Sequence, residues 1–175
     1  METTKNELTE YEQQFFFNLK NYIDKPIYFY GSIQRGDYFP QSSDIDVDIF
    51  TDNVNSTLHL LQNYLRILKT DCKNTIYKMN ETNQIIPGYK IKYEDEIHNL
   101  HVEFSLYNEK YKKEILEEHN SKNNLPSYLI TILIFLKLLY YKFGMLTEKY
   151  YDIIKKFVCN YCYDNNTAEF VKLDL

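Results

Sequence analysis

Two neighbouring segments decide the fold of this chain: GSIQRG at residues 31–36 and SDIDVDIF at residues 43–50. In the second segment carboxylates alternate with apolar residues, and this period of two predicts a β-strand. The alternation turns the apolar side chains toward a core and places three carboxylates together on the opposite face. These carboxylates are Asp44, Asp46 and Asp48. Like charges this close raise the pKa of at least one member, so the arrangement is costly unless cations neutralise it.

The residues before the acidic strand suggest what that face could bind. Ile27 to Tyr30 is a short apolar run that predicts a buried strand, and Gly31 ends it. A glycine lets the backbone approach a ligand closely, while Ser32 and the following amides can donate hydrogen bonds to phosphate oxygens. Paired carboxylates and phosphate oxygens together form the ligand set that Mg²⁺ prefers. The competing interpretation is a solvated strand face at a sheet edge, where charges discourage aggregation.

The same residues resemble the nucleotidyltransferase superfamily typified by DNA polymerase beta. The resemblance is strong over residues 27–50, where it rests on Gly31-Ser32 with Arg35-Gly36 and on Asp44-Ile45-Asp46. It extends to about residue 107 by strand order, with Val102-Glu103-Phe104 as a weaker third motif. It implies that three acids are catalytic and bind two Mg²⁺ or Mn²⁺ ions, namely Asp44, Asp46 and Glu103. It also implies four nucleotide-binding residues, namely Gly31, Ser32, Arg35 and Lys137.

Two features depart from the family pattern. Glu103 stands where many members have aspartate, and Asp48 is an extra acid, so the metal-binding pair could instead be Asp46 and Asp48. The spacing from Gly31 favours Asp44 and Asp46. His101 shares the face of Glu103, and we interpret it as a strand histidine bonded to a neighbour.

The function that the resemblance implies is a metal-dependent nucleotidyltransferase of the EC 2.7.7 type. It would move a nucleoside monophosphate from an NTP to an acceptor hydroxyl and release pyrophosphate. The expected acceptor is a nucleic-acid 3′ end, such as single-stranded RNA or tRNA, or a small molecule. The alternative is a catalytically inert module of the same fold that binds a nucleotide or a protein partner, in an antitoxin or regulatory role.

The expected fold class is α+β, with a small mixed sheet of the polymerase beta palm type backed by helices. We divide the chain into a catalytic core at residues 1–107 and a helical C-terminal part at residues 108–175. Helical periodicity marks the segments 5–22, 58–68, 109–119, 126–143 and 147–161, and strand patterns mark 27–30, 44–50, 85–93 and 97–107.

Composition sets the remaining expectations. The 175 residues have a formal net charge of −5 and are 44% hydrophobic, which predicts a packed globular fold without a strongly basic surface. Residues 125–143 are apolar but contain Lys137 and Lys142, so we expect a buried core helix and no membrane partner. Three cysteines and a charged first segment favour the cytoplasm, and Cys159 with Cys162 is expected to be a helix pair rather than a zinc site. The sequence leaves the oligomeric state open.

Overall fold

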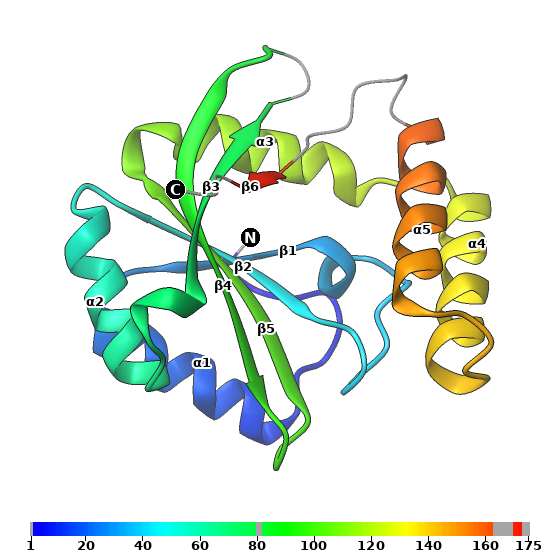
Figure 1. The fold of residues 1–175 in the computed structure, drawn as a ribbon, viewed down its shortest axis with the longest axis horizontal. Helices are drawn as coiled ribbons and strands as arrows, with labels where there is room; N and C mark the ends of the chain where they lie inside the picture. Colours follow the sequence, from blue (N-terminus) through cyan, green and yellow to red (C-terminus); the bar gives the residue numbers. More distant parts are fainter. Residues whose placement is uncertain (1, 80–81, 163–169, 173–175) are drawn as a thin grey trace.

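The computed structural model describes residues 2–79, 82–162 and 170–172. Strands of these segments form one six-stranded sheet in the order β1-β2-β5-β4-β3-β6 (Figure 1). β2 and β5 run parallel, whereas the other neighbours are antiparallel. The strands are β1 (Ile27–Tyr30), β2 (Ile45–Thr51), β3 (Cys72–Lys78), β4 (Ile85–Asp95), β5 (Leu100–Asn108) and β6 (Phe170–Lys172). The helices are α1 (Glu10–Ile23), α2 (Val54–Leu65), α3 (Lys112–Asn123), α4 (Ser127–Lys137) and α5 (Glu148–Cys162).

Helices α1 and α2 cover one face of the sheet. Thr9 caps α1, since its hydroxyl accepts from the Glu12 amide while the Glu12 carboxylate accepts from the Thr9 amide. Both helices turn apolar side chains onto β2 and β5, and the resulting core includes Phe16, Leu19, Leu61, Val47 and Phe104. The apolar side chains of β2 lie in this core, so the carboxylates of β2 point to the opposite face of the sheet.

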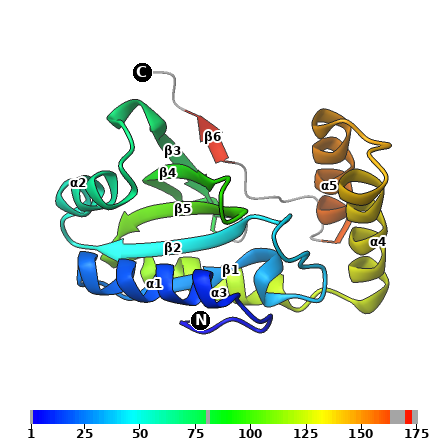
Figure 2. The ribbon, with the colours of Figure 1, turned by 90° about the horizontal axis from the view of Figure 1, so that it is seen from below.

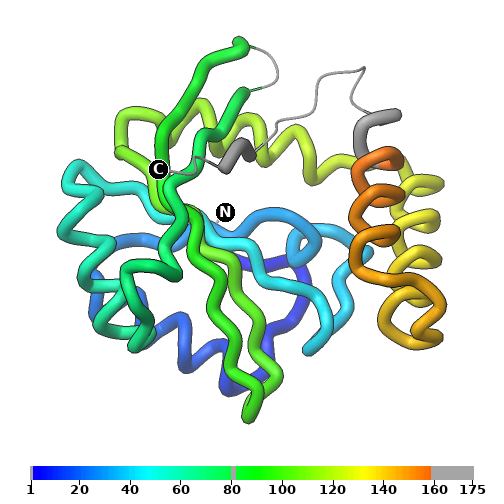
Figure 3. Tube along the Cα trace, in the orientation of Figure 1, coloured from blue at the N-terminus to red at the C-terminus, as the bar shows by residue number. Residues whose placement is uncertain are grey.

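The other face is only partly covered by a helix. Ile115 of α3 joins a second apolar cluster with Tyr28, Phe50, Tyr77 and Tyr107 at one end of that face. Helices α4 and α5 stand side by side beside the sheet, at the end where β2 begins (Figures 1 and 2). In the trace of Figure 3 the segment between β1 and β2 reaches toward this helix pair. The acidic end of β2 is therefore framed by α3, the β1–β2 segment and the α4–α5 pair.

The structure confirms the α+β fold class, and β1 matches its predicted limits. Two strands were not predicted. β3 is mostly polar, with only Ile76 and Tyr77 as large apolar residues, and β6 lies in the part of the chain expected to be helical.

The predicted single helix at 126–143 is interrupted. α4 ends at Lys137, and a π-helical turn follows over Leu138–Lys142. The expectation of a buried core helix is correct for one face only: Leu129, Leu133 and Leu136 are buried, whereas Phe135 is 61% exposed. Among the described residues, no single helix has the length and apolarity needed to span a membrane; helices over Glu109–Asn123 and Ser127–Lys142 pass that test only as a pair bent by 86°.

Candidate active site

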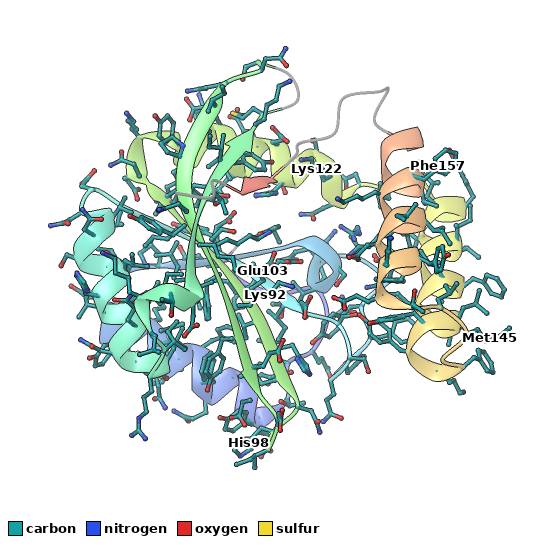
Figure 4. The ribbon with its side chains drawn as sticks, viewed as in Figure 1. Lys92, His98, Glu103, Lys122, Met145 and Phe157 are labelled. Carbon is teal, nitrogen blue, oxygen red and sulfur yellow. The ribbon has the colours of Figure 1, made fainter. Side chains whose placement is uncertain are left out.

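Asp46 and Glu103 are neighbours on the exposed end of the sheet. Their Cα atoms are partners in the parallel β2–β5 pair, and both side chains lie on the face opposite the α1–α2 core. Glu103 forms an ion pair with Lys90 of β4, and the Nζ of Lys92 lies 3.9 Å from its second oxygen. Glu103 and Lys92 are labelled near the middle of the sheet in Figure 4. Two predicted metal ligands thus meet at one point, with lysines as their counter-ions.

The charge of Asp46 is poorly compensated in this arrangement. Burial and, next, the negative charge of Glu103 raise its pKa from 3.8 to about 7, although the charge of Lys90 lowers it. Its carboxylate forms no side-chain hydrogen bond or ion pair with any residue that the structure describes. A carboxylate in this state is stabilised by an added cation.

Asp44 lies at the mouth of the site. It directly precedes β2 and is exposed, and a shallow hollow lies between it and Glu103. Lys92, Tyr93, Glu94 and Val102 complete the lining of this hollow. Within residues 2–79, 82–162 and 170–172, no three His, Cys, Asp or Glu side chains converge on one point. Asp44, Asp46 and Glu103 supply carboxylate oxygens, the hard donors that a divalent cation prefers, so these residues fit such an ion. Lys90 now pairs with Glu103 and would have to give way to the cation.

Gly31 brings the backbone against Asp46. It begins the short 3₁₀ turn Gly31–Gln34 with a φ of 72°, and a Cβ at this position would stand 2.1 Å from Asp46 Oδ2. Ser32 follows and is buried. Glycine is therefore required at position 31 both by its left-handed backbone and by the space that the carboxylate occupies. The structure brings the predicted phosphate cradle and the predicted metal ligand together.

Arg35 and Lys137 meet at a different carboxylate, that of Asp37. The Arg35 guanidinium donates to both Asp37 oxygens, over 2.8 and 3.1 Å. The ammonium of Lys137 donates to the Asp37 carbonyl over 2.6 Å and to Ser43 Oγ over 3.1 Å, and lies 3.4 Å from Asp37 Oδ2. Burial lowers the pKa of Lys137 to about 8, although the charge of Asp37 raises it. Both cations hold the β1–β2 segment that carries the site.

Lys155 of α5 is a cation that the sequence analysis did not assign to the site. It is exposed, and its charge lowers the pKa of both Asp46 and Lys137, so it lies near both groups. The aromatic ring of Tyr151 lies beneath its Nζ at 5.6 Å. The sequence signal was a lysine-rich C-terminal segment, but only the folded α4–α5 pair shows which lysine faces the carboxylates.

The pairing of Asp48 with His119 was not predicted either. His119 of α3 places Nε2 3.1 Å from Asp48 Oδ2, and both side chains are shielded from solvent. The ring of Tyr30 stacks on His119 with 4.1 Å between centroids. Burial raises the pKa of Asp48, while His119 opposes that shift. Asp48 is thus engaged by α3 and lies deeper than Asp46, whereas Asp44 lies on the open side.

Two other residues from the sequence analysis occupy ordinary positions. His101 is half-buried on the face of Glu103, opposite Glu94 of β4. The side chains of Cys159 and Cys162 lie outside the described residues.

Comparison with known proteins identifies the family. A solved structure of Cid1, titled as having RNA terminal uridylyl transferase activity, shares 17% sequence identity with a TM-score of 0.39. The similarity covers 71% of this chain but 37% of the Cid1 chain, so the present chain spans well under half of that protein. No curated protein matches. The family described as "Nucleotidyltransferase domain" matches residues 12–128, which include every motif described above apart from Lys137 and α5. Since this match extends over more than half of the sequence, the chain belongs to the nucleotidyltransferase domain family.

Proposed function

We propose that this chain is an active nucleotidyltransferase that uses a divalent cation to transfer a nucleoside monophosphate from an NTP to an acceptor hydroxyl. The observation that carries the proposal is the meeting of Asp46, Glu103 and Gly31 at one end of the sheet. Retained acids alone could be explained by ancestry. An under-neutralised carboxylate pressed against a glycine turn is a costly arrangement that a bound cation and phosphate would relieve.

The reaction follows from the groups present. The acceptor oxygen attacks the α-phosphorus, and the bond from that phosphorus to the oxygen bridging to the β-phosphate breaks. Pyrophosphate leaves with that oxygen and its electron pair, and the proton of the acceptor hydroxyl passes to water. Asp44, Asp46 and Glu103 would hold two Mg²⁺ or Mn²⁺ ions, which when bound lower the pKa of the attacking hydroxyl and neutralise developing charge.

The other residues of the site bind and orient the nucleotide. Ser32 and the amides of the Gly31–Gln34 turn would donate to phosphate oxygens, and exposed Lys155 would balance the charge of the triphosphate. Arg35 and Lys137, both bound to Asp37, would keep the β1–β2 segment in place while the nucleotide enters. Lys90 would release Glu103 when a cation takes its place.

The acceptor is a nucleic-acid 3′ end or a small molecule. The test uses each of the four α-labelled NTPs with Mg²⁺ or Mn²⁺ and with single-stranded RNA, tRNA, a DNA primer, a panel of small hydroxyl compounds or no acceptor. Release of pyrophosphate is measured in parallel, so that a labelled small product is not overlooked. The Asp46→Asn and Glu103→Gln variants remove one candidate ligand each, and Asp52→Asn is the matched control because Asp52 is exposed just beyond β2.

The expected result is label on one acceptor for the wild type and for Asp52→Asn, with a loss of about 100-fold or more in the two site variants. NTP binding by calorimetry without pyrophosphate release under any of these conditions would overturn the proposal. Equal activity of Asp46→Asn and the wild type would remove Asp46 from the site.

A further inference from the structure

The α4–α5 pair exposes an unusually apolar surface. Nine large apolar side chains on the two helices and the link between them are between 38% and 72% exposed, and we call these residues the outer face. The outer face consists of Tyr128, Ile132, Phe135, Phe143, Met145, Tyr150, Ile153, Ile154 and Phe157. Figure 4 labels two of them, Met145 in the link and Phe157 on α5, both on the helix pair that stands beside the sheet. None of these side chains belongs to the site described above.

The spacing of these residues is that of helices that pack against other helices. Tyr128, Ile132 and Phe135 recur at four and three residues on α4, and Tyr150, Ile153 or Ile154, and Phe157 do so on α5. At 100° per residue, the charged residues of α5 fall on the opposite arc. These are Glu148, Lys149, Asp152, Lys155 and Lys156. α5 is therefore amphipathic, and its apolar side is the one left open.

The packing of α5 within one chain is slight. Over residues 148–158, whose side chains the structure describes, only Tyr151 is buried, and its ring stacks on Tyr140 with centroids 4.5 Å apart. Most stability of a helix in a protein comes from burial of its apolar stripe. A helix with Phe157 69% exposed and Tyr150 61% exposed lacks that contribution until a partner covers it.

The exposed area of the outer face is large enough for a stable interface. With about 200 Å² for a fully exposed side chain of this kind, the exposed fractions amount to roughly 1,000 Å². A monomer usually exposes no apolar patch above about 600 Å², and a stable interface buries about 800 Å² on each partner. The outer face therefore has the area of one side of a stable interface. An apolar partner is required, because burying a charged surface here would leave its charges unpaired.

We propose that the outer face is a two-fold interface between two copies of this chain, with α4 and α5 of each copy forming a four-helix arrangement. A second copy presents the same apolar stripes at equal concentration, and a two-fold axis matches a self-complementary face to itself. No charge of α5 needs to lose its water, since the charged arc points away from the stripe. A membrane surface is less suited, because the polar arc of α5 mixes acids with lysines and is not uniformly basic.

The test is the mass of the full chain in solution, measured by sedimentation equilibrium across the micromolar range. The wild type is expected at twice the protomer mass of 21.2 kDa. Phe157→Glu and Phe135→Glu are each expected to weaken the dimer by about 30-fold or more, since each charge enters the interface twice. Phe17→Glu is the matched control, because Phe17 is 62% exposed on α1, outside the outer face.

A monomer at every concentration would overturn the proposal, as would a dimer that Phe17→Glu disrupts equally. Binding of a monomeric wild type to anionic vesicles would assign the face to a membrane and also overturn it. Hydrogen exchange of the wild-type chain tests the dimer without any variant, so misfolding of a variant cannot affect the result. Amides of α4 and α5 are expected to gain protection as the protein concentration rises, and unchanged exchange would contradict a dimer at this face.

Discussion

Gly31 and Asp46 are in such close contact that a Cβ at position 31 would stand 2.1 Å from the Asp46 carboxylate, so a larger residue there must displace that side chain. The contact joins the end of β1 to the middle of the site, so the glycine turn and the acidic strand behave as one unit. A substitution at Gly31 therefore reports on the geometry of the carboxylate as well as on the turn.

Gly31→Ala should lower transfer strongly. Gly144→Ala shows whether the cause is backbone strain or displacement of Asp46. Both glycines have positive φ, 72° and 59°, but nothing lies within 4 Å of a Cβ at Gly144. Each alanine should cost about 1 kcal/mol of unfolding free energy from backbone strain. Only Gly31→Ala should displace Asp46 and lower transfer by about 100-fold or more. Unfolding curves and initial rates check this, and equal losses of rate in both variants would show that strain alone matters.

Asp46 should make stability fall with rising pH when no divalent cation is present. Its pKa is 3.8 unfolded and about 7 folded, so between these values the folded state binds the extra proton and loses stability as pH increases. At about 1.4 kcal/mol per pKa unit, the total cannot exceed about 4 kcal/mol. Asp46→Asn should flatten this slope, whereas Asp52→Asn should keep it. Urea unfolding at a series of pH values measures the slope, and parallel wild-type and Asp46→Asn curves would contradict the assignment.

His119→Leu should destabilise the chain strongly. It leaves Asp48 buried without the imidazole now 3.1 Å away, and a buried polar group left without its partner costs about 1–3 kcal/mol. The double variant Asp48→Asn with His119→Leu should recover most of that loss. His59→Leu, on the exposed side of α2, serves as the control. Denaturant unfolding at neutral pH provides the values, and a His119→Leu cost below about 1 kcal/mol would rule out a pair of this strength.

Lys137 should give stability the opposite dependence on pH. Burial lowers its pKa from 10.5 to about 8, so between these values the unfolded state binds more protons and stability increases with pH. Lys137→Met should remove this rise, while Lys142→Met, at an exposed lysine of the following turn, should retain it. Unfolding measured from pH 8 to 10.5 tests the difference between the two variants. If stability rises with pH as steeply in Lys137→Met as in the wild type, the Lys137 ammonium is solvated and does not cause the rise.

The acidic strand was predictable because two strong signals coincide in it. The apolar residues of β2 repeat with a period of two and its carboxylates fill the alternate positions, so propensity and patterning agree. β3 offers neither signal: Lys73, Asn74 and Thr75 interrupt any apolar pattern. Its place in the sheet is set by pairing with β4 and β6. Burial of Thr75 and Tyr77 thus depends on neighbours that are distant in sequence.

Some residues of the candidate site could likewise be predicted from the sequence and others could not. Gly31, Asp44 and Asp46 lie within one short segment, and a local motif was sufficient to find them. His119 and Lys155 come from helices whose own sequences give no reason to single them out. α3 is mostly polar, and Lys155 is one of several lysines in the C-terminal segment. Their roles arise only when α3 and α5 pack beside β2.

A single-residue insertion or deletion inside β2 would exchange its two faces. Every later carboxylate would turn into the packing between sheet and helices, and every later aliphatic residue would turn to solvent. No point substitution could repair such a change, because the packing of the core and the position of the carboxylates would be lost together. Length variation among relatives of this chain should therefore be absent from residues 45–51 and concentrated in loops, such as the one between β4 and β5. Among relatives, the identities of residues in β2 can therefore vary, whereas the number of residues in the strand cannot.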